Sequence, residues 1–302
     1  MKKFLVLIFA SISLVSTAQQ LPLYSQYMMN AFLLNPAIAG SVDYFPIRLT
    51  ARQQWVGIND APSTQALSAH YLFEYQKLGV GGYIFNDNFG PMSRIGIQAC
   101  ASYHLPLTGI SSKLGIGFAL KGFQFKFDES KLKAIDDADP ALSYSTITKF
   151  VPDADFGVYL YNDKYFVGIS ATQLVQLNID FGDSSIDKNA IIRHYYAMGG
   201  YKFTLNDDFD VEPSLLFKGT MQTPWQIDFN VKAYYKRMYW LGVSYRSSKD
   251  IVAMLGVKIK KYYLGYAFDY TLSNIKRYTS GSHEILLGIN ITEGKNRGSK
   301  LL

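Results

Sequence analysis

The chain has 302 residues, of which 48% are hydrophobic, 15% aromatic and 18% charged, with a formal net charge of +6 and a mean hydropathy of 0.00. The low charged fraction, the 24 Gly and the 43 Phe and Tyr residues exclude a disordered tail, a collagen-like fibre and a coiled coil. A neutral mean hydropathy with this many aromatic residues favours many amphipathic strands.

The first eighteen residues have the pattern of an export signal. Lys2 and Lys3 precede an apolar stretch over 4–15, and the small residues at 16–18 offer a cleavage site before Gln19. The apolar stretch is too short for a transmembrane helix, and no later stretch has eighteen uninterrupted apolar residues. Removing the signal lowers the formal charge to +4. Because no Lys/Arg-rich run follows, we expect no nucleic acid partner.

Cysteine usage adds little to the choice of fold class. Cys100 is the single cysteine, so the chain cannot contain an internal disulfide framework. It lies between two alanines and is best interpreted as a small strand residue. A secreted soluble enzyme, a lectin-like sandwich and an outer-membrane barrel all remain open at this point.

Apolar residues alternate with polar or small ones along most of the chain. Every second residue is apolar from Trp225 to Tyr235, from Tyr262 to Tyr270 and from Ile285 to Ile291. This period predicts strands with one apolar face. Fourteen such segments follow the signal, near 46–54, 64–74, 78–87, 93–105, 112–127, 154–162, 165–173, 194–204, 210–218, 224–235, 237–247, 250–258, 261–270 and 282–292.

The connections between these segments sort by length. Those after even-numbered strands are mostly tight and polar: Tyr75-Gln76-Lys77, Asp163-Lys164, Asn206-Asp207 and Lys260-Lys261. Those after odd-numbered strands are often longer: 55–63, 128–153, 174–193 and 271–281. The connections 106–111 and 247–249 depart from this rule. Outer-membrane barrels combine an even strand count with short periplasmic turns and long outer loops, whereas a β-sandwich has no reason to sort its loops by parity.

Aromatic residues are concentrated beside the predicted turns, where a barrel has its interfacial girdles. They are Tyr71, Phe73, Tyr75, Tyr103, Tyr159, Tyr161, Tyr234, Tyr235, Tyr239, Trp240, Tyr262 and Tyr263. The sequence therefore predicts an all-β transmembrane outer-membrane β-barrel of about 14 antiparallel strands, with both termini periplasmic. We expect a signal peptide over 1–18, a periplasmic or lumenal segment over 19–45, the barrel over 46–292 and a periplasmic tail over 293–302.

A search for catalytic and metal-binding patterns selects no site. His70, His104, His194 and His283 are isolated, and no H-E-x-x-H or G-x-S-x-G motif is present. The acidic residues within 128–153 do not have the spacing of an EF-hand loop. We therefore expect no enzymatic activity, no cofactor and no metal. A Ser/His/acid esterase on the barrel rim stays open as an alternative, although no serine is singled out.

Several motifs resemble one known family. They are Leu23 to Ser41 (LYSQYMMNAFLLNPAIAGS), Arg52 to Ile58 (RQQWVGI), Ala61 to Thr64 (APST), Ser244-Tyr245-Arg246, Phe268-Asp269-Tyr270 and Gly281 to Ile285 (GSHEI). In order and spacing they resemble the PorP/SprF family of outer-membrane proteins. The chain departs from the usual barrel end, because it finishes in a Lys/Gly-rich tail where an aromatic residue is typical.

The resemblance implies a barrel of the type IX secretion and gliding machinery. Some family members serve the export of one large surface adhesin, so the implied partners are outer-membrane lipid, other type IX secretion components and a secreted surface protein as cargo. The residues of the motifs that could form a plug or contact a partner are Tyr24, Gln26, Asn30, Asn35, Pro36, Arg52, Trp55, Gly57, Arg246, Asp269, His283 and Glu284. A passive transport barrel for small or hydrophobic solutes is the main alternative function.

The residues themselves support a more modest interpretation of these motifs. The stretch 24–40 is too polar, and too broken by Asn35-Pro36, for a lipid-facing strand, so we expect it under or inside the barrel. Trp55 and Gly57 open the first outer loop, where a simple turn anchor is an alternative. Arg52, Arg246, Asp269 and Glu284 are expected on polar faces, where ion pairs in the lumen are favoured over contacts with a substrate.

Overall fold

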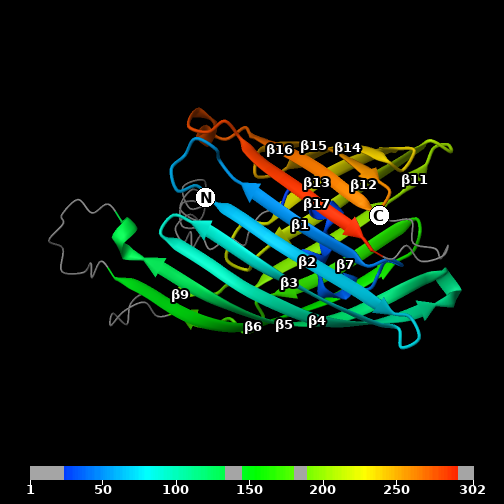
Figure 1. Ribbon diagram of the computed structural model, residues 1–302, viewed down its shortest axis with the longest axis horizontal. Helices are drawn as coiled ribbons and strands as arrows, with labels where there is room; N and C mark the ends of the chain where they lie inside the picture. The colour runs from blue at the N-terminus through cyan, green and yellow to red at the C-terminus, as the bar shows by residue number, and fades with distance from the viewer. Residues whose placement is uncertain (1–23, 133–144, 180–188, 292–302) are drawn as a thin grey trace, which may run out of the picture.

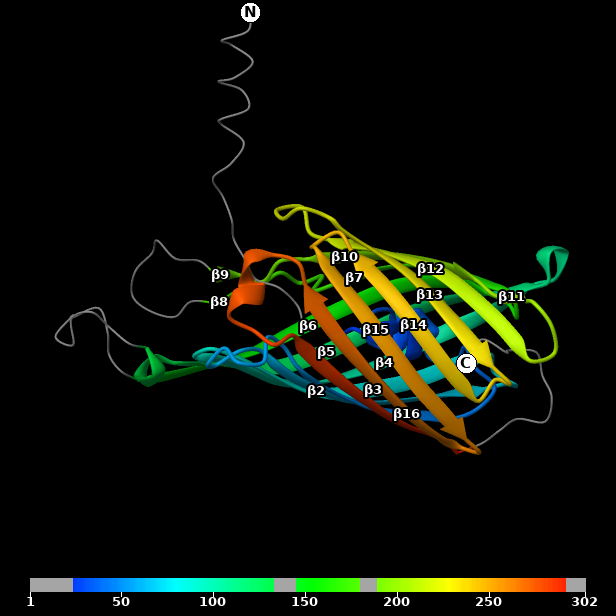
Figure 2. The same cartoon turned by 90° about the horizontal axis from the view of Figure 1, so that it is seen from above.

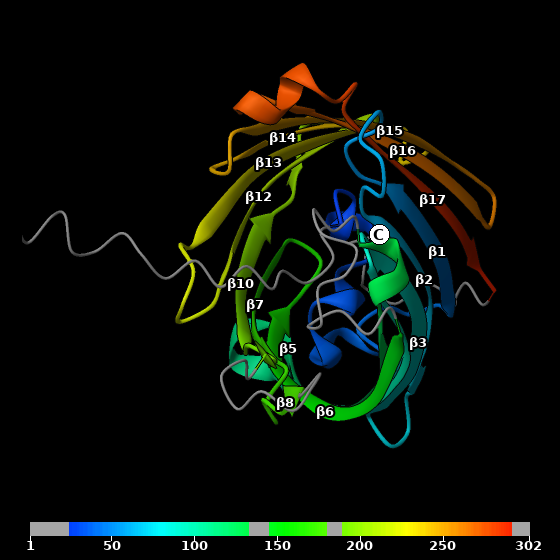
Figure 3. The same cartoon turned by 90° about the vertical axis from the view of Figure 1, so that its left-hand side faces the viewer.

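Fourteen antiparallel strands close into a barrel (Figures 1 and 3). The computed structural model describes residues 24–132, 145–179 and 189–291. The barrel strands are β1 (Pro46–Gln53), β2 (Ser63–Phe73), β3 (Leu78–Phe89), β4 (Met92–Leu107), β5 (Ser112–Asp128), β6 (Thr146–Tyr161), β7 (Tyr165–Thr172), β10 (His194–Tyr201), β12 (Phe209–Gly219), β13 (Gln226–Tyr235), β14 (Tyr239–Arg246), β15 (Asp250–Ile259), β16 (Tyr262–Thr271) and β17 (Ser282–Asn290).

Pairing between β1 and β17 closes the ring, and β10 pairs with both β7 and β12. The predicted fourteen-stranded barrel is thereby confirmed. The short strand β11 (Phe203–Thr204) pairs with β12, while β8 (Asn178–Ile179) and β9 (Asn189–Ala190) form a separate two-stranded sheet. Closure matters in lipid, because only a closed sheet pairs every backbone polar group.

The two ends of the barrel carry different connections. We call the end with the turns 74–77, 108–111, 162–164, 202–208, 236–238 and 260–261 the turn rim, and the end with the connections 54–62, 90–91, 129–145, 173–193, 220–225, 247–249 and 272–281 the loop rim. In Figure 1, the arrowhead of β1 points to the loop rim and that of β17 to the turn rim. Strand β1 therefore begins, and β17 ends, at the turn rim.

Each strand alternates between an apolar outer face and a polar or small inner face. In β1, Arg48, Thr50 and Arg52 are buried in the lumen, whereas Leu49 points outward and is exposed. The same alternation gives the barrel a continuous outer band of Leu, Ile, Val and Phe. None of the helices in the described parts of the chain is long and apolar enough to cross a membrane.

Strand β6 is longer than the sequence predicts. It begins at Thr146, eight residues before the predicted start at 154, and pairs with β5 as far as Asp128. The connection expected over 128–153 is therefore shorter. Pro152 argues against a strand in the sequence, because proline has no backbone N–H to donate. The structure tolerates it because β6 pairs with β7 only from Phe156 onward, so no strand lies beside Pro152 on that side. In Figure 1, the β5–β6 hairpin reaches farther to the left than its neighbours.

The predicted aromatic girdle is only partly on the outer surface. Seven of the twelve residues are exposed, namely Tyr71, Phe73, Tyr75, Tyr103, Tyr235, Tyr239 and Tyr262. The other five are buried in the lumen and are corrected here to core residues: Tyr159, Tyr161, Tyr234, Trp240 and Tyr263. Large rings are needed inside as well as outside, because the interior of a barrel this wide must be filled.

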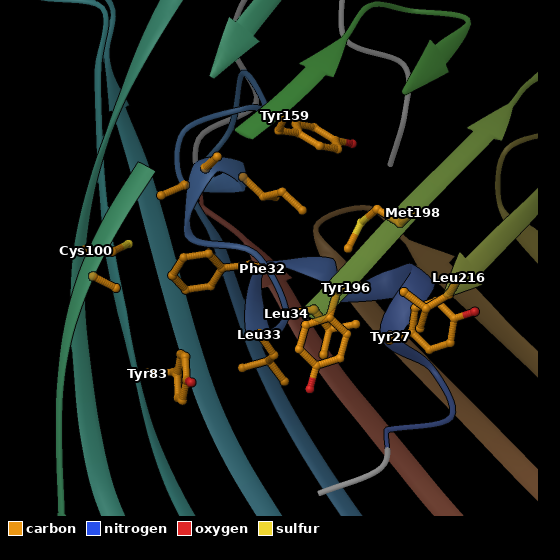
Figure 4. Close-up of a cluster of buried hydrophobic side chains, with 14 of the residues drawn as sticks. Tyr27, Phe32, Leu33, Leu34, Tyr83, Cys100, Tyr159, Tyr196, Met198 and Leu216 are labelled. Atoms are coloured by element: carbon orange, nitrogen blue, oxygen red, sulfur yellow. The ribbon is translucent and has the colours of Figure 1, made fainter. Parts of the chain in front are cut away.

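The core lies inside the barrel, around residues 24–45, which we call the lumenal segment. Three short 3-10 turns form it: η1 (Tyr27–Met29), η2 (Ala31–Leu33) and η3 (Pro36–Ile38). Figures 2 and 3 show this blue segment enclosed by the strands. Phe32 and Leu33 pack with Tyr83, Tyr196 and other rings of the barrel wall (Figure 4). Residues 24–40, which were expected under or inside the barrel, lie inside it.

Candidate functional site: the lumenal segment

A buried carboxylate holds the first described residues of the lumenal segment. The backbone N–H groups of Ser25 and Gln26 donate to the two carboxylate oxygens of Glu284, at 2.6 and 2.8 Å. The Gln26 side-chain amide also donates to the Glu284 carbonyl oxygen at 3.2 Å. Hydrogen bonds to an ionised group inside a protein are stronger than neutral ones. Glu284, on β17, therefore fixes the position and direction of the backbone at this point.

A second carboxylate and two arginines surround the Ser25 hydroxyl. This hydroxyl donates to Asp269 at 2.7 Å, and it accepts hydrogen bonds from the guanidinium groups of Arg52 and Arg246. Both arginines also bind Asp269 directly, each at 2.8 Å. All four side chains are buried. The barrel thus brings three strands, β1, β14 and β16, to a single serine of the lumenal segment.

The charges of this cluster balance. Asp228 lies 3.4 Å from Arg246 and 3.8 Å from Lys218. The cluster therefore contains three cations and three carboxylates, namely Arg52, Lys218 and Arg246 with Asp228, Asp269 and Glu284. A buried charge without a partner is costly, so a neutral network is the arrangement that a lumen can accommodate. We name Ser25, Gln26, Arg52, Arg246, Asp269 and Glu284 the ionic anchor.

Neutral hydrogen bonds attach the middle of the lumenal segment to other strands. Asn30 donates to the Ser68 hydroxyl of β2 at 3.0 Å, and Asn230 of β13 donates to the Tyr27 hydroxyl at 2.6 Å. Burial raises the pKa of the Tyr27 phenol, so the hydroxyl stays neutral and can serve in such bonds. The segment is therefore tied to the wall on several sides along its length.

Asn35 and Pro36 form a second anchor, which we call the Asn35 anchor. The Asn35 side-chain oxygen accepts a hydrogen bond from the Ala37 backbone N–H at 2.9 Å and caps η3, whose first residue is Pro36. Its amide nitrogen donates to the carbonyl oxygens of Val158 and Ile169, at 3.1 and 3.2 Å. One side chain thus caps the turn and binds strands β6 and β7.

The two anchors lie on opposite walls of the barrel. Asp269 belongs to β16 and Val158 to β6, and six strands separate β6 from β16 in either direction around the ring. The lumenal segment therefore crosses the lumen and braces one wall against the other.

Glycines on the inner wall make room for the segment at the Asn35 anchor. A Cβ added to Gly157 of β6 would overlap the Asn35 side-chain oxygen, and one added to Gly117 of β5 would overlap the Ala37 backbone. A Cβ at Gly79 of β3 would overlap the Ala39 carbonyl oxygen. Glycine permits this close approach of two backbones because it has no side chain. These residues of β3, β5 and β6 form a trough that fits residues 35–39.

The lumenal segment runs from the loop-rim half of the barrel toward the turn rim. Tyr24 lines a cavity together with Arg94 and Thr172, which lie near the loop-rim ends of β4 and β7. The segment ends just before Pro46, the first residue of β1, which lies at the turn rim. The predicted signal peptide (1–18) and C-terminal tail (293–302) lie outside the described residues.

Small cavities lie on both sides of the lumenal segment. The one toward the turn rim has a volume of about 100 Å³ and is lined by Tyr27, Arg48, His70 and Glu212, among others. The one toward the loop rim, at Tyr24, has a volume of about 50 Å³. Since a single water needs ~10–15 Å³ of cavity volume, the larger cavity has room for at most about ten waters and the smaller for about five.

The remaining candidate residues lie apart from the lumen centre. The Trp55 backbone N–H donates to the Ser282 hydroxyl at 3.1 Å and so fastens the connection 54–62 to the start of β17, while Gly57 lies beside the Tyr278 carbonyl of the connection 272–281. His283 contacts the Tyr266 hydroxyl at 2.6 Å. The structure therefore brings together Gln26, Arg52, Arg246, Asp269 and Glu284, but not Trp55, Gly57 or His283.

Sequence reasoning missed Ser25, Asp228 and the glycines of the trough as parts of this site. Ser25 lies within the family-like motif and could have been found there, whereas Gly117 and Gly157 look like ordinary small strand residues. Among the described residues, no group of three or more His, Cys, Asp or Glu side chains is placed to hold a metal ion.

Solved outer-membrane barrels resemble this structure at low sequence identity. The Acinetobacter baumannii outer membrane protein Omp33 is 8% identical with a TM-score of 0.49, covering 82% of this chain and 98% of its own. A Pseudomonas aeruginosa FadL homologue is 9% identical with a TM-score of 0.49, over 90% and 95% of the two chains. The CymD monoaromatic hydrocarbon channel is 14% identical with a TM-score of 0.48, over 93% and 96%.

No curated protein sequence matches the chain. A family model does match, over residues 16–289, which include the ionic anchor, the Asn35 anchor and nearly the whole barrel. Its description is Type IX secretion system membrane protein PorP/SprF. This chain therefore belongs to the PorP/SprF family of type IX secretion system membrane proteins.

Proposed function

We propose that this outer-membrane barrel is an accessory or cargo-specific partner of the type IX secretion machinery. Its role would be in the export or surface attachment of a large cell-surface protein. Family membership supports the link to type IX secretion. The observation that supports a partner role over a channel role is the lumenal segment, which crosses the barrel between two anchors.

The filled lumen argues against passive transport of solutes. Residues 25–41 are almost all buried within the barrel, and the two cavities that this segment lines are about 100 and 50 Å³. A drug-sized ligand needs a pocket of roughly 300–1,000 Å³. A larger cavity of about 780 Å³ opens at the turn rim between residues 106–113 and 161–164 and is not lined by the segment. The barrel in this form is therefore better suited to present a rigid surface than to pass a solute.

We further propose that the signal peptide is cleaved before Gln19, that the turn rim faces the periplasm and that the protein has no enzymatic activity. Short turns on the periplasmic side are the rule for bacterial outer-membrane barrels, which supports this orientation. The partners on the periplasmic side would be other components of the secretion and gliding machinery.

Surface display tests the proposal. Deleting the gene should abolish display of one or a few large proteins, while uptake of small solutes is unchanged. Complementation with the wild-type chain should restore display, whereas Asn35→Ala should restore it poorly at equal protein level. Normal display of every surface protein, with impaired uptake of a nutrient, would instead establish the transport function.

A further inference from the structure

We infer that the turn rim carries a binding site for the phosphate of an anionic phospholipid, formed by the neighbouring turns β13–β14 and β15–β16. The site consists of Lys236, Arg237, Lys260 and Lys261, which we call the basic rim patch. The function proposed above does not require it, although the identity of the lipid follows from the proposed orientation.

Charge distinguishes these two turns from the rest of the rim. Residues 235–242 and 256–263 contain five basic residues and no acidic one. Other turns of the same rim mix the two signs, as in Glu74 with Lys77 and Asp163 with Lys164. Arg237 reaches Asp210 of β12 at 3.3 Å, and Lys236 lies in the field of Asp208. The patch therefore keeps a positive surplus, which suits an anionic ligand.

The fold places the two turns side by side. Strands β14 and β15 are paired with Tyr239 opposite Val257, and the Lys258 backbone N–H donates to the Met238 carbonyl oxygen at 2.6 Å. The cations of both turns thus lie at one edge of the barrel wall. A single phosphate group between the turns can be approached from both of them.

Backbone conformation gives independent support for a role of the side chains at 236 and 237. Lys236 and Arg237 have φ values of 51° and 52°, and the Met238 N–H closes the turn on the Tyr235 carbonyl at 3.0 Å. Two consecutive positive φ values define a type I′ turn, for which Asn-Gly is the favoured pair. Lys and Arg are strained in this conformation. The turn therefore holds two cations at the expense of local stability.

The surroundings match a lipid rather than a soluble anion. Tyr235, Tyr239 and Tyr262 are exposed beside the two turns, at the level where aromatic girdles meet lipid headgroups. Lys261 lies over the Tyr262 ring at 5.5 Å, and Lys236 over the Tyr235 ring at 5.3 Å. Farther from the rim, Leu241, Leu255 and Leu264 form an exposed apolar wall. A phospholipid whose phosphate binds at the patch would have its acyl chains in contact with this wall.

Native mass spectrometry of the purified barrel with added lipid tests the site. We expect phosphatidylglycerol to bind more tightly than phosphatidylethanolamine. The double variant K236N/R237G removes both cations and installs the favoured type I′ pair, which offsets part of the loss of the Arg237–Asp210 ion pair. Lys202 remains 3.9 Å from Asp210, so the barrel should still fold, as its mobility shift on unboiled gels would show. Because each basic residue near a lipid surface contributes about 1 kcal/mol, the affinity for phosphatidylglycerol should fall by about tenfold or more.

K260N/K261Q should weaken phosphatidylglycerol binding in the same way. Lys77→Asn is the matched control, since Lys77 is also a turn-rim lysine with a positive φ of 53° but lies outside the patch. Equal binding of the two phospholipids, or unchanged phosphatidylglycerol binding in both double variants, would refute the site. Preferential binding of lipid A, lost in the same variants, would refute the assigned ligand and place this rim in the outer leaflet.

Discussion

The Ser25 backbone N–H donates to the Glu284 carboxylate at 2.6 Å, although 259 residues separate the two in sequence. Glu284 belongs to the last strand, β17, whose pairing with β1 closes the barrel. The ionic anchor is therefore complete only once the ring is closed. The lumenal segment and the barrel wall stabilise each other, because each supplies partners for polar groups that the other buries.

Replacing Glu284 with Gln should loosen the ionic anchor. The change removes one of three carboxylates that balance three buried cations, and breaking a buried pair costs about 3–5 kcal/mol. We expect the temperature at which the barrel unfolds, measured by its mobility shift on unboiled gels, to fall by several degrees. Glu74→Gln at the exposed turn rim should leave it unchanged. An unfolding temperature equal to that of the wild type would show that Glu284 is not an anchor.

Substitution of Gly157 tests the trough. The added Cβ of Gly157→Ala would overlap the Asn35 side-chain oxygen, so stability should fall by about 1–3 kcal/mol, as for other overpacked sites. Asn35→Ala removes the overlapping atoms, so the double variant should lose less stability than the sum of the two single changes. Denaturant unfolding measures this coupling.

Gly199→Ala is the matched control for the trough, because its Cβ would meet only the Phe166 carbonyl oxygen, at an ordinary 3.5 Å, and a valine methyl farther away. Additive effects of Gly157→Ala and Asn35→Ala would contradict the close approach of these two residues and separate the Asn35 anchor from the glycine trough.

Deletion of residues 22–40 should open the barrel. The intact protein should conduct poorly in planar bilayers, because the lumenal segment crosses between β16 and β6. The deletion removes the anchored turns and should raise single-channel conductance several-fold in those molecules that still show the mobility shift of a folded barrel. High conductance of the intact protein would mean that the segment does not obstruct ion flow.

Cysteine labelling on whole cells tests the orientation. A cysteine replacing Ser248, exposed at the loop rim, should react with a membrane-impermeant maleimide, whereas one replacing Lys77 at the turn rim should react only after lysis. The native Cys100 is buried, so the background should be low. Labelling of Lys77→Cys but not of Ser248→Cys on intact cells would reverse the proposed orientation.

The alternation of apolar and polar residues predicted the barrel and the approximate bounds of its fourteen strands. Lipid outside and a polar lumen inside impose a period of two on every strand, as from Trp225 to Tyr235, and this signal is local. The sorting of connections by parity followed from the same alternation of rims. Where this signal was interrupted, as at Pro152, the prediction lost the first part of β6.

How the lumen is filled depends on contacts that form only in the closed barrel. The alternation separates Tyr234 from Tyr235, of which the first is buried and the second exposed, but it does not indicate what the buried ring packs against. Arg52, Asp269 and Glu284 meet at Ser25 because β1, β16 and β17 become neighbours when the ring closes. Gly157 lies against the Asn35 side chain, 122 positions away in sequence, for the same reason. Periodicity reports the environment of each strand, whereas contacts across the lumen depend on the closed ring as a whole.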